Sequence, residues 1–129
     1  MIYLDTSVVL SQLLSEDRKP PVTIWDGPLV ASRLLEYEVW TRLHARTLTA
    51  SHGDQARTLL GRVAFIELSR PVLARALEPF PIPVRTLDAL HLASAVFLRE
   101  RGQDIAVASF DDQFVRAARL LELEIVPLT

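Results

Sequence analysis

The chain has 129 residues, of which 50% are apolar and 23% charged, with a net charge of −2, so we expect one compact domain, residues 1–129, and not a disordered segment. The absence of cysteine excludes disulfides, thiolate zinc sites and cysteine nucleophiles, and fits a cytoplasmic protein. The first residues carry no basic stretch and no run of about 18 apolar residues follows, so we expect neither a secretory signal nor a membrane span.

Short apolar runs alternate along the chain with longer amphipathic stretches. Thr6 or Ser7 could cap a first helix, which a polar stretch at 17–21 would end, and a short helix could extend to Trp25. Strands are expected at 2–4, 29–31, 65–68, 105–110 and 124–128. Further helices are expected at 32–48, 51–63, 71–78, 86–101 and 111–121. This alternation predicts an α/β fold with three layers, α/β/α, around a central parallel sheet of four to five short strands.

Four acidic residues stand in apolar sequence, where a carboxylate is unusual. They are Asp5 in IYLDTS, Glu38 in SRLLEYEVW, Asp88 in RTLDALHLASA and Asp111 in VASFDDQF. Each has an ordinary explanation as a helix cap, a first-turn acid or, for Glu38, a partner of Arg42. In a parallel α/β sheet, however, all four can reach the edge where the strands end and ligands bind. Carboxylates gathered there would suit a hard divalent cation such as Mg²⁺ or Mn²⁺.

Asp88 is the most informative of the four acids. Nine of the twelve residues 87–98 are apolar, which predicts a helix buried almost all round. An ionised carboxylate in such a helix is costly unless it is paired or binds metal. His91, three residues later, could supply a hydrogen bond to it, and a core histidine is favoured over a metal ligand at that position.

Two of the acids have acidic neighbours that compete for the same role. Glu36 is the alternative to Glu38, and Asp112 is the alternative to Asp111. Helical neighbours one or two positions apart point to different faces, so one member of each pair can enter a shared pocket. We choose Asp111 because it directly follows the predicted strand.

These four segments together resemble PIN-domain ribonucleases, and more narrowly the VapC-type toxins of toxin–antitoxin pairs. The resemblance covers nearly the whole chain, and RTLDALHLASA is its most specific part. The family's acidic site maps onto the four acids named above, and three hydroxyl residues lie near the first and fourth of them: Thr6, Ser7 and Ser109. Glu122 departs from the pattern, because relatives often have glycine there.

The resemblance implies an endoribonuclease dependent on Mg²⁺ or Mn²⁺, the toxin of a type II toxin–antitoxin pair. Asp5, Asp88 and Asp111 would be metal ligands, and Glu38 a further ligand or a base that orients water. One metal or two are both compatible with these residues, and the carboxylates alone would fit DNA as well as RNA. Expected partners are the RNA substrate, a cognate antitoxin and a second copy of the chain. The alternative is a catalytically inactive PIN-fold binding module.

Overall fold

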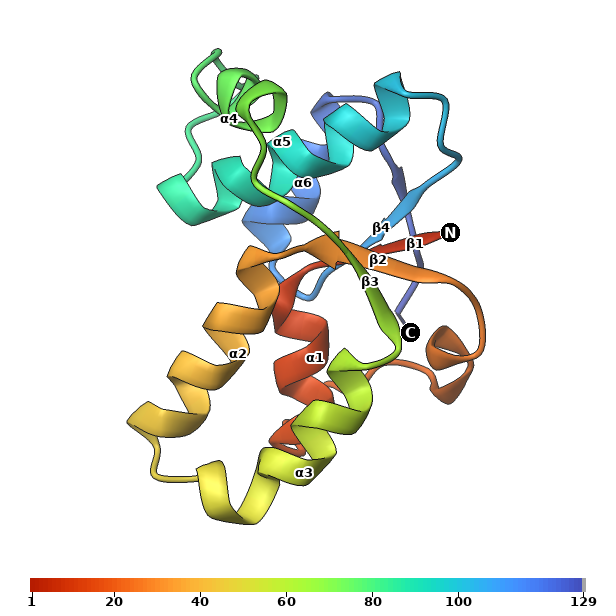
Figure 1. The fold of residues 1–129 in the computed structure, drawn as a ribbon. Coiled ribbons are helices and arrows are strands. Elements are labelled where there is room, and N and C mark those ends of the chain that lie inside the picture. Colours follow the sequence, from red (N-terminus) through yellow and green to blue (C-terminus); the bar gives the residue numbers. More distant parts are fainter. Residues whose placement is uncertain (129) are drawn as a thin grey trace.

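One parallel sheet of five short strands forms the centre of the computed structural model, which describes residues 1–128 (Figure 1). The strands are β1 (Ile2–Leu4), β2 (Leu29–Ser32), β3 (Val63–Ile66), β4 (Ala106–Ala108) and β5 (Glu124–Ile125). Their spatial order is β3-β2-β1-β4-β5, so the direction of winding reverses between β1 and β4. Ligands of open α/β sheets bind at such a reversal, outside the carboxyl ends of the strands.

Helices cover both faces of this sheet. They are α1 (Thr6–Leu13), the 3₁₀ turn η1 (Val22–Trp25), α2 (Leu34–Ala45), α3 (Thr49–Leu60), α4 (Arg70–Ala76), α5 (Thr86–Glu100) and α6 (Asp112–Leu120). Helices α1, α2 and α3 lie on one side of the sheet, and α4, α5 and α6 lie on the other (Figure 1). The predicted α/β/α architecture with a parallel sheet is therefore confirmed. No helix within residues 1–128 is both long enough and apolar enough to cross a membrane.

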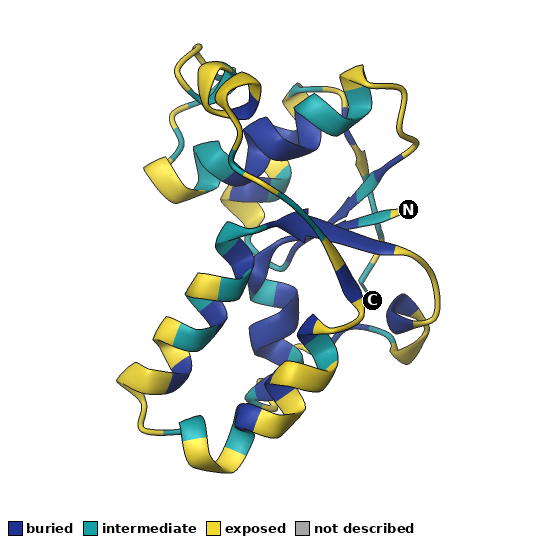
Figure 2. Ribbon diagram, viewed as in Figure 1, coloured by how far each residue is buried: buried dark blue, intermediate teal, exposed yellow. Residues whose placement is uncertain are grey.

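The sheet separates two apolar cores, because successive side chains of a strand point to opposite faces. Leu4 and Ala108 pack with α1, α2 and α3, whereas Tyr3 and Val107 pack with α5 and α6. Figure 2 shows the buried strands enclosed between helices whose outer faces are exposed. Burial raises the pKa of Tyr3, and its hydroxyl donates to the His91 carbonyl at 2.7 Å, which ties β1 to α5.

Three of the predicted helix starts were wrong, and α2 begins at Leu34 instead of Ser32. Thr6 and Ser7 are the first residues of α1, and Asp5 occupies the N-cap position without accepting a hydrogen bond from the helix amides. Helix α3 begins at Thr49, two residues before the predicted start, and the Ser51 hydroxyl donates to a carbonyl of the preceding turn. Ser and Thr hydroxyls also bond locally to the backbone inside helices, so their presence alone does not locate a cap.

Two further details differ from the prediction. Strand β3 lies two residues earlier than 65–68, because Val63 pairs with the first residue of β2 in a continuous parallel ladder. Helix α5 is fully buried only in its middle, at residues 91–96, and Leu87 in its first turn is 47% exposed. The first turn of α5, which carries Asp88, is therefore open to solvent on one side.

Candidate active site

A cavity of about 740 Å³ lies where β1 and β4 end, and all four predicted acids line it. Asp5 follows β1, Glu38 comes from α2, Asp88 from the first turn of α5, and Asp111 from the connection between β4 and α6. The two helical layers thus both contribute carboxylates to one space.

The acidic neighbours of these residues lie elsewhere. Asp112 is exposed and does not line the cavity. Glu36 also lies outside the lining, and its carboxylate is 3.6 Å from the guanidinium of Arg33 on the same helix turn. The geometry therefore favours Asp111 over Asp112 and Glu38 over Glu36 as cavity residues.

Asp5 is held by two hydroxyl groups at the junction of β1 and β4. Its side-chain oxygen Oδ2 accepts hydrogen bonds from Ser7 Oγ and Ser109 Oγ, each at 2.7 Å. Asp5 is only 6% exposed, and its amide donates to the Ala108 carbonyl at 3.0 Å. Within residues 1–128 no hydrogen bond occupies Oδ1, so this oxygen remains available for a ligand.

Glu38 is positioned by Thr6 and by a buried histidine. Thr6 Oγ1 donates to Glu38 Oε1 at 3.0 Å, and His91 Nε2 bonds to the same oxygen. His91 is 1% exposed, and its Nδ1 has no hydrogen-bond partner among the described residues. A proton on Nδ1 would thus be buried and unsatisfied, which favours the tautomer whose Nε2–H donates to Glu38.

Asp88 and Asp111 share one basic neighbour. Arg85, the residue before α5, places Nε 3.6 Å from Asp88 Oδ2 and Nη2 3.6 Å from Asp111 Oδ2. Asp111 also caps α6, because its Oδ1 accepts from the amides of Gln113 at 3.0 Å and Phe114 at 3.2 Å. The capping explanation therefore holds for Asp111 through Oδ1, while its Oδ2 lies near Arg85 in the cavity lining.

Asp88 carries the least compensated charge of the site. Shielding from water raises its pKa, and the negative charges of Asp111 and Asp5 raise it further, whereas Arg85 and His91 lower it by smaller amounts. This electrostatic repulsion indicates a cavity that would gain from a bound cation. Among residues 1–128, however, no three His, Asp or Glu side chains are grouped closely enough to hold a metal ion as they stand.

Sequence reasoning missed most of the basic part of this cavity. It named only Arg42, as an ion-pair partner of Glu38, and that ion pair does not form among residues 1–128. Four arginines line the cavity: Arg18, Arg42, Arg46 and Arg85. Sequence reasoning also paired His91 with Asp88, one turn away, whereas the structure pairs His91 with Glu38 of another helix. The positions of Arg42 and Arg46, four and eight residues after Glu38, were the signal that could have placed them on its face of α2.

Known proteins resemble this chain over most of its length. The family model described as PIN domain matches residues 2–120. The chain belongs to the PIN domain family. Ribonuclease VapC47 of Mycobacterium tuberculosis (strain CDC 1551 / Oshkosh) is 29% identical over 125 residues, which are 92% of this chain and 90% of that protein. Ribonuclease VapC46 of M. tuberculosis (strain ATCC 25618 / H37Rv) is 29% identical over 129 residues, 97% of this chain and 95% of that protein.

Proposed function

We propose that this PIN domain is a metal-dependent endoribonuclease that hydrolyses RNA phosphodiester bonds and serves as the toxin of a type II toxin–antitoxin pair. The observation that carries the proposal is the single cavity that collects all four acids at the carboxyl edge of the sheet. The two relatives named as ribonucleases, each similar over 90% or more of this chain, support RNA as the substrate.

The donor set suits a hard divalent cation, Mg²⁺ or Mn²⁺. Asp5, Asp88 and Asp111 would hold it, with Glu38 as a further ligand or as the base. Six carboxylates and four guanidinium groups line the cavity, so one divalent cation would balance the charge of the lining. When bound, such an ion activates water and stabilises the negative charge that develops on the phosphate.

The side chains around the four acids support separate tasks. Ser7 and Ser109 hold Asp5 Oδ2 and leave Oδ1 free to bind a ligand. Thr6 and His91 hold Glu38 Oε1, so its Oε2 is the atom that would accept a proton from the attacking water. Such hydrogen bonds fix the orientation of ligands and bases, and their loss commonly reduces activity about 10–100-fold.

Cleavage of labelled single-stranded RNA by the purified protein in Mn²⁺ tests the proposal. The wild-type protein should cut the RNA and should stop when a chelator is added. Asp5→Asn and Asp88→Asn should each lose activity by about a hundredfold or more, because each removes a charged oxygen from the metal site. The matched controls Glu36→Gln and Asp112→Asn, which change acids outside the cavity, should cut at the wild-type rate.

The alternative of an inactive PIN-fold binding module is not favoured, because all four acids line the cavity. It makes a distinct prediction in the same assay. A rise in melting temperature with Mn²⁺, combined with no RNA cleavage at any metal concentration, would support the binding module and contradict the nuclease.

The proposed protein partners are a cognate antitoxin and a second copy of the chain. Apolar side chains on α4 and directly after it support a protein interface, since Leu73 is 41% and Leu77, the C-cap residue, is 89% exposed. Light scattering on the purified chain should give twice its mass of 14.5 kDa if the homodimer forms. Co-purification with the product of an adjacent short reading frame, together with loss of RNA cleavage, would identify the antitoxin.

A further inference from the structure

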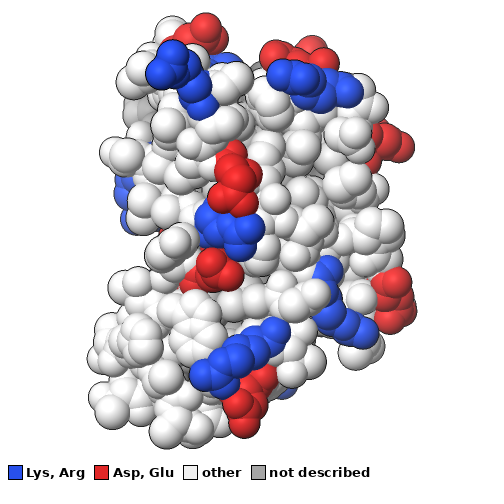
Figure 3. Space-filling view, viewed as in Figure 1, with Lys and Arg blue, Asp and Glu red and all other residues white. Residues whose placement is uncertain are grey.

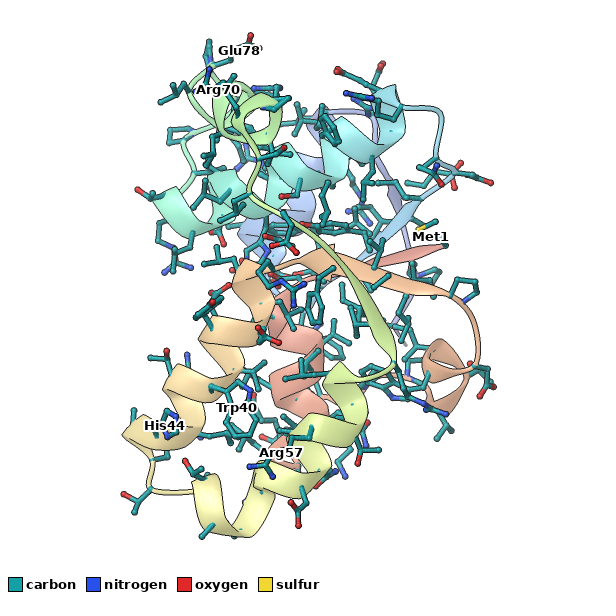
Figure 4. All side chains as sticks on the ribbon, viewed as in Figure 1. Met1, Trp40, His44, Arg57, Arg70 and Glu78 are labelled. Atoms are coloured by element: carbon teal, nitrogen blue, oxygen red, sulfur yellow. The ribbon has the colours of Figure 1, made fainter. Side chains whose placement is uncertain are left out.

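One face of α2 extends the cavity away from the four acids. Glu38, Arg42 and Arg46 are spaced four residues apart, all line the cavity, and both arginines are exposed. At ~1.5 Å per residue, Arg46 lies about 12 Å along the helix from Glu38. The other face of α2 is occupied differently, because Trp40 and His44 stack at 6.1 Å and point toward α3 (Figure 4).

Three of the four arginines in the cavity have no anionic partner. Within residues 1–128, Arg18, Arg42 and Arg46 form no ion pair and their guanidinium groups make no hydrogen bond, whereas Arg85 contacts two carboxylates. On the face shown in Figure 3, basic groups mostly adjoin acidic ones. Guanidinium groups bind phosphate readily through their planar fork, so three unpaired ones beside an acidic centre indicate an anionic ligand that passes through the cavity.

Arg18 adds a flat surface to the part of the cavity that Arg42 and Arg46 line. Its guanidinium lies over the ring of Phe110, 4.9 Å from the ring centre, and both residues line the cavity. The Ser11 hydroxyl donates to the Arg18 carbonyl and ties the loop after α1 to the helix. Nucleic-acid bases stack on aromatic rings and guanidinium planes when they are unpaired, as in single strands.

We propose that the wall formed by α2 and the loop after α1 binds single-stranded RNA on one side of the bond to be cut. Arg42 and Arg46 bind backbone phosphates, and a base stacks on the surface that Arg18 forms with Phe110. This inference rests on the proposed ribonuclease function, and it adds which wall of the cavity holds the strand.

Binding of a fluorescent oligoribonucleotide, measured by anisotropy in the presence of chelator, tests the wall separately from cleavage. The double variant Arg42→Gln/Arg46→Gln should weaken binding about tenfold or more. It should also reduce the slope of log affinity against log salt by about 0.7 per lost phosphate contact. The control Arg116→Gln/Arg119→Gln, which changes two exposed arginines of α6 outside the cavity, should leave both quantities unchanged.

A charge-conserving variant tests the stacking surface. Arg18→Lys keeps the positive charge but loses the planar guanidinium. It should weaken binding of the single strand several-fold with little change in the salt slope, and it should not affect a duplex RNA of the same sequence. Equal effects on the single strand and the duplex would overturn the stacking role.

The outcomes separate the two proposals. Wild-type affinity and salt slope in Arg42→Gln/Arg46→Gln, with RNA still cut by the wild-type protein, would overturn this inference and leave the ribonuclease in place. A wild-type protein that neither binds nor cuts RNA would overturn both. If a hexaglutamate peptide bound more tightly than the RNA, and the double variant lost this binding, the wall would be assigned to an acidic protein partner instead.

Discussion

Charge at the cavity is unevenly compensated from residue to residue. Asp5 receives two hydroxyl hydrogen bonds, and Glu38 receives one from Thr6 and one from His91. Among residues 1–128, Asp88 accepts no side-chain hydrogen bond and forms one ion pair, with the Arg85 guanidinium at 3.6 Å. A cation would therefore relieve more repulsion at Asp88 than at the other acids, and the free protein should show the cost of leaving that carboxylate charged.

Replacing Asp88 should stabilise the metal-free protein in a pH-dependent way. Its pKa in the folded protein is raised above the ordinary 3.8, so the fold disfavours the charged form. That penalty is absent when the residue is protonated in both states, appears as the pH rises above the ordinary value, and is complete above the folded pKa. Asp88→Asn should thus raise the melting temperature near neutral pH and leave it unchanged near pH 3.

Thermal unfolding in chelator across this pH range checks the expectation, with Asp112→Asn, at an exposed acid outside the cavity, as the control. When Mn²⁺ is added, the wild-type protein should have the higher melting temperature, because it binds the ion and Asp88→Asn does not. If Asp88→Asn had the same melting temperature as wild type at every pH, the Asp88 charge would already be compensated in the folded protein.

Arg85 and a metal ion should compete for the same carboxylates. Its guanidinium reaches both Asp88 and Asp111, yet its side chain is 83% exposed and free to move away. Arg85→Gln should therefore bind Mn²⁺ about threefold or more tightly in the absence of RNA, because a positive charge is removed from the site. Calorimetric titration measures this directly, and Arg116→Gln is the control. Unchanged or weaker binding would mean that Arg85 does not occupy the metal position.

How far the site could be predicted differs between its acids and its other residues. The acids were predictable because a carboxylate in apolar sequence needs a reason, and the strand pattern placed all of them at one edge. The arginines were not, because an exposed arginine is ordinary on any surface. The partner of His91 was also hidden, since Glu38 is 53 residues away and belongs to another helix layer.

Among the elements, the end of α6 is strained. Glu122 follows the helix with φ of 63°, a left-handed conformation that costs most residues about 1–2 kcal/mol. The Leu123 amide donates to the Ala118 carbonyl at 3.0 Å, as in a Schellman C-cap. This hydrogen bond holds Glu122 in the left-handed conformation. The family resemblance implies glycine at this position, and the left-handed conformation gives the physical reason.

Glu122→Gly should stabilise the protein. Glycine adopts the left-handed region without strain, and about 0.5–1 kcal/mol of that gain is lost to its greater freedom in the unfolded chain. A net increase of about 0.5–1 kcal/mol in the free energy of unfolding follows, measurable by urea denaturation. Glu124→Gly, in strand β5, should destabilise instead, because glycine weakens a strand. Equal effects at both positions would contradict the strain argument.

At the scale of the whole molecule, the three central strands join the two cores. Adjacent residues of β1, β2 and β4 face opposite layers, so each strand contributes to both apolar clusters. Neither layer can lose its packing without removing one face of the same strands. We therefore expect residues 1–129 to behave as one cooperative domain.

The two tryptophans allow a test of this cooperativity. Trp25 belongs to the core on the side of α1, α2 and α3, and Trp40 packs against the same core. Tryptophan fluorescence thus reports one layer, whereas far-ultraviolet circular dichroism reports helices on both sides. In urea the two signals should give the same midpoint and the same slope, as a two-state transition requires. If fluorescence changed at a lower urea concentration than circular dichroism, the layer of α1, α2 and α3 would unfold separately, and the shared strands would not couple the two cores.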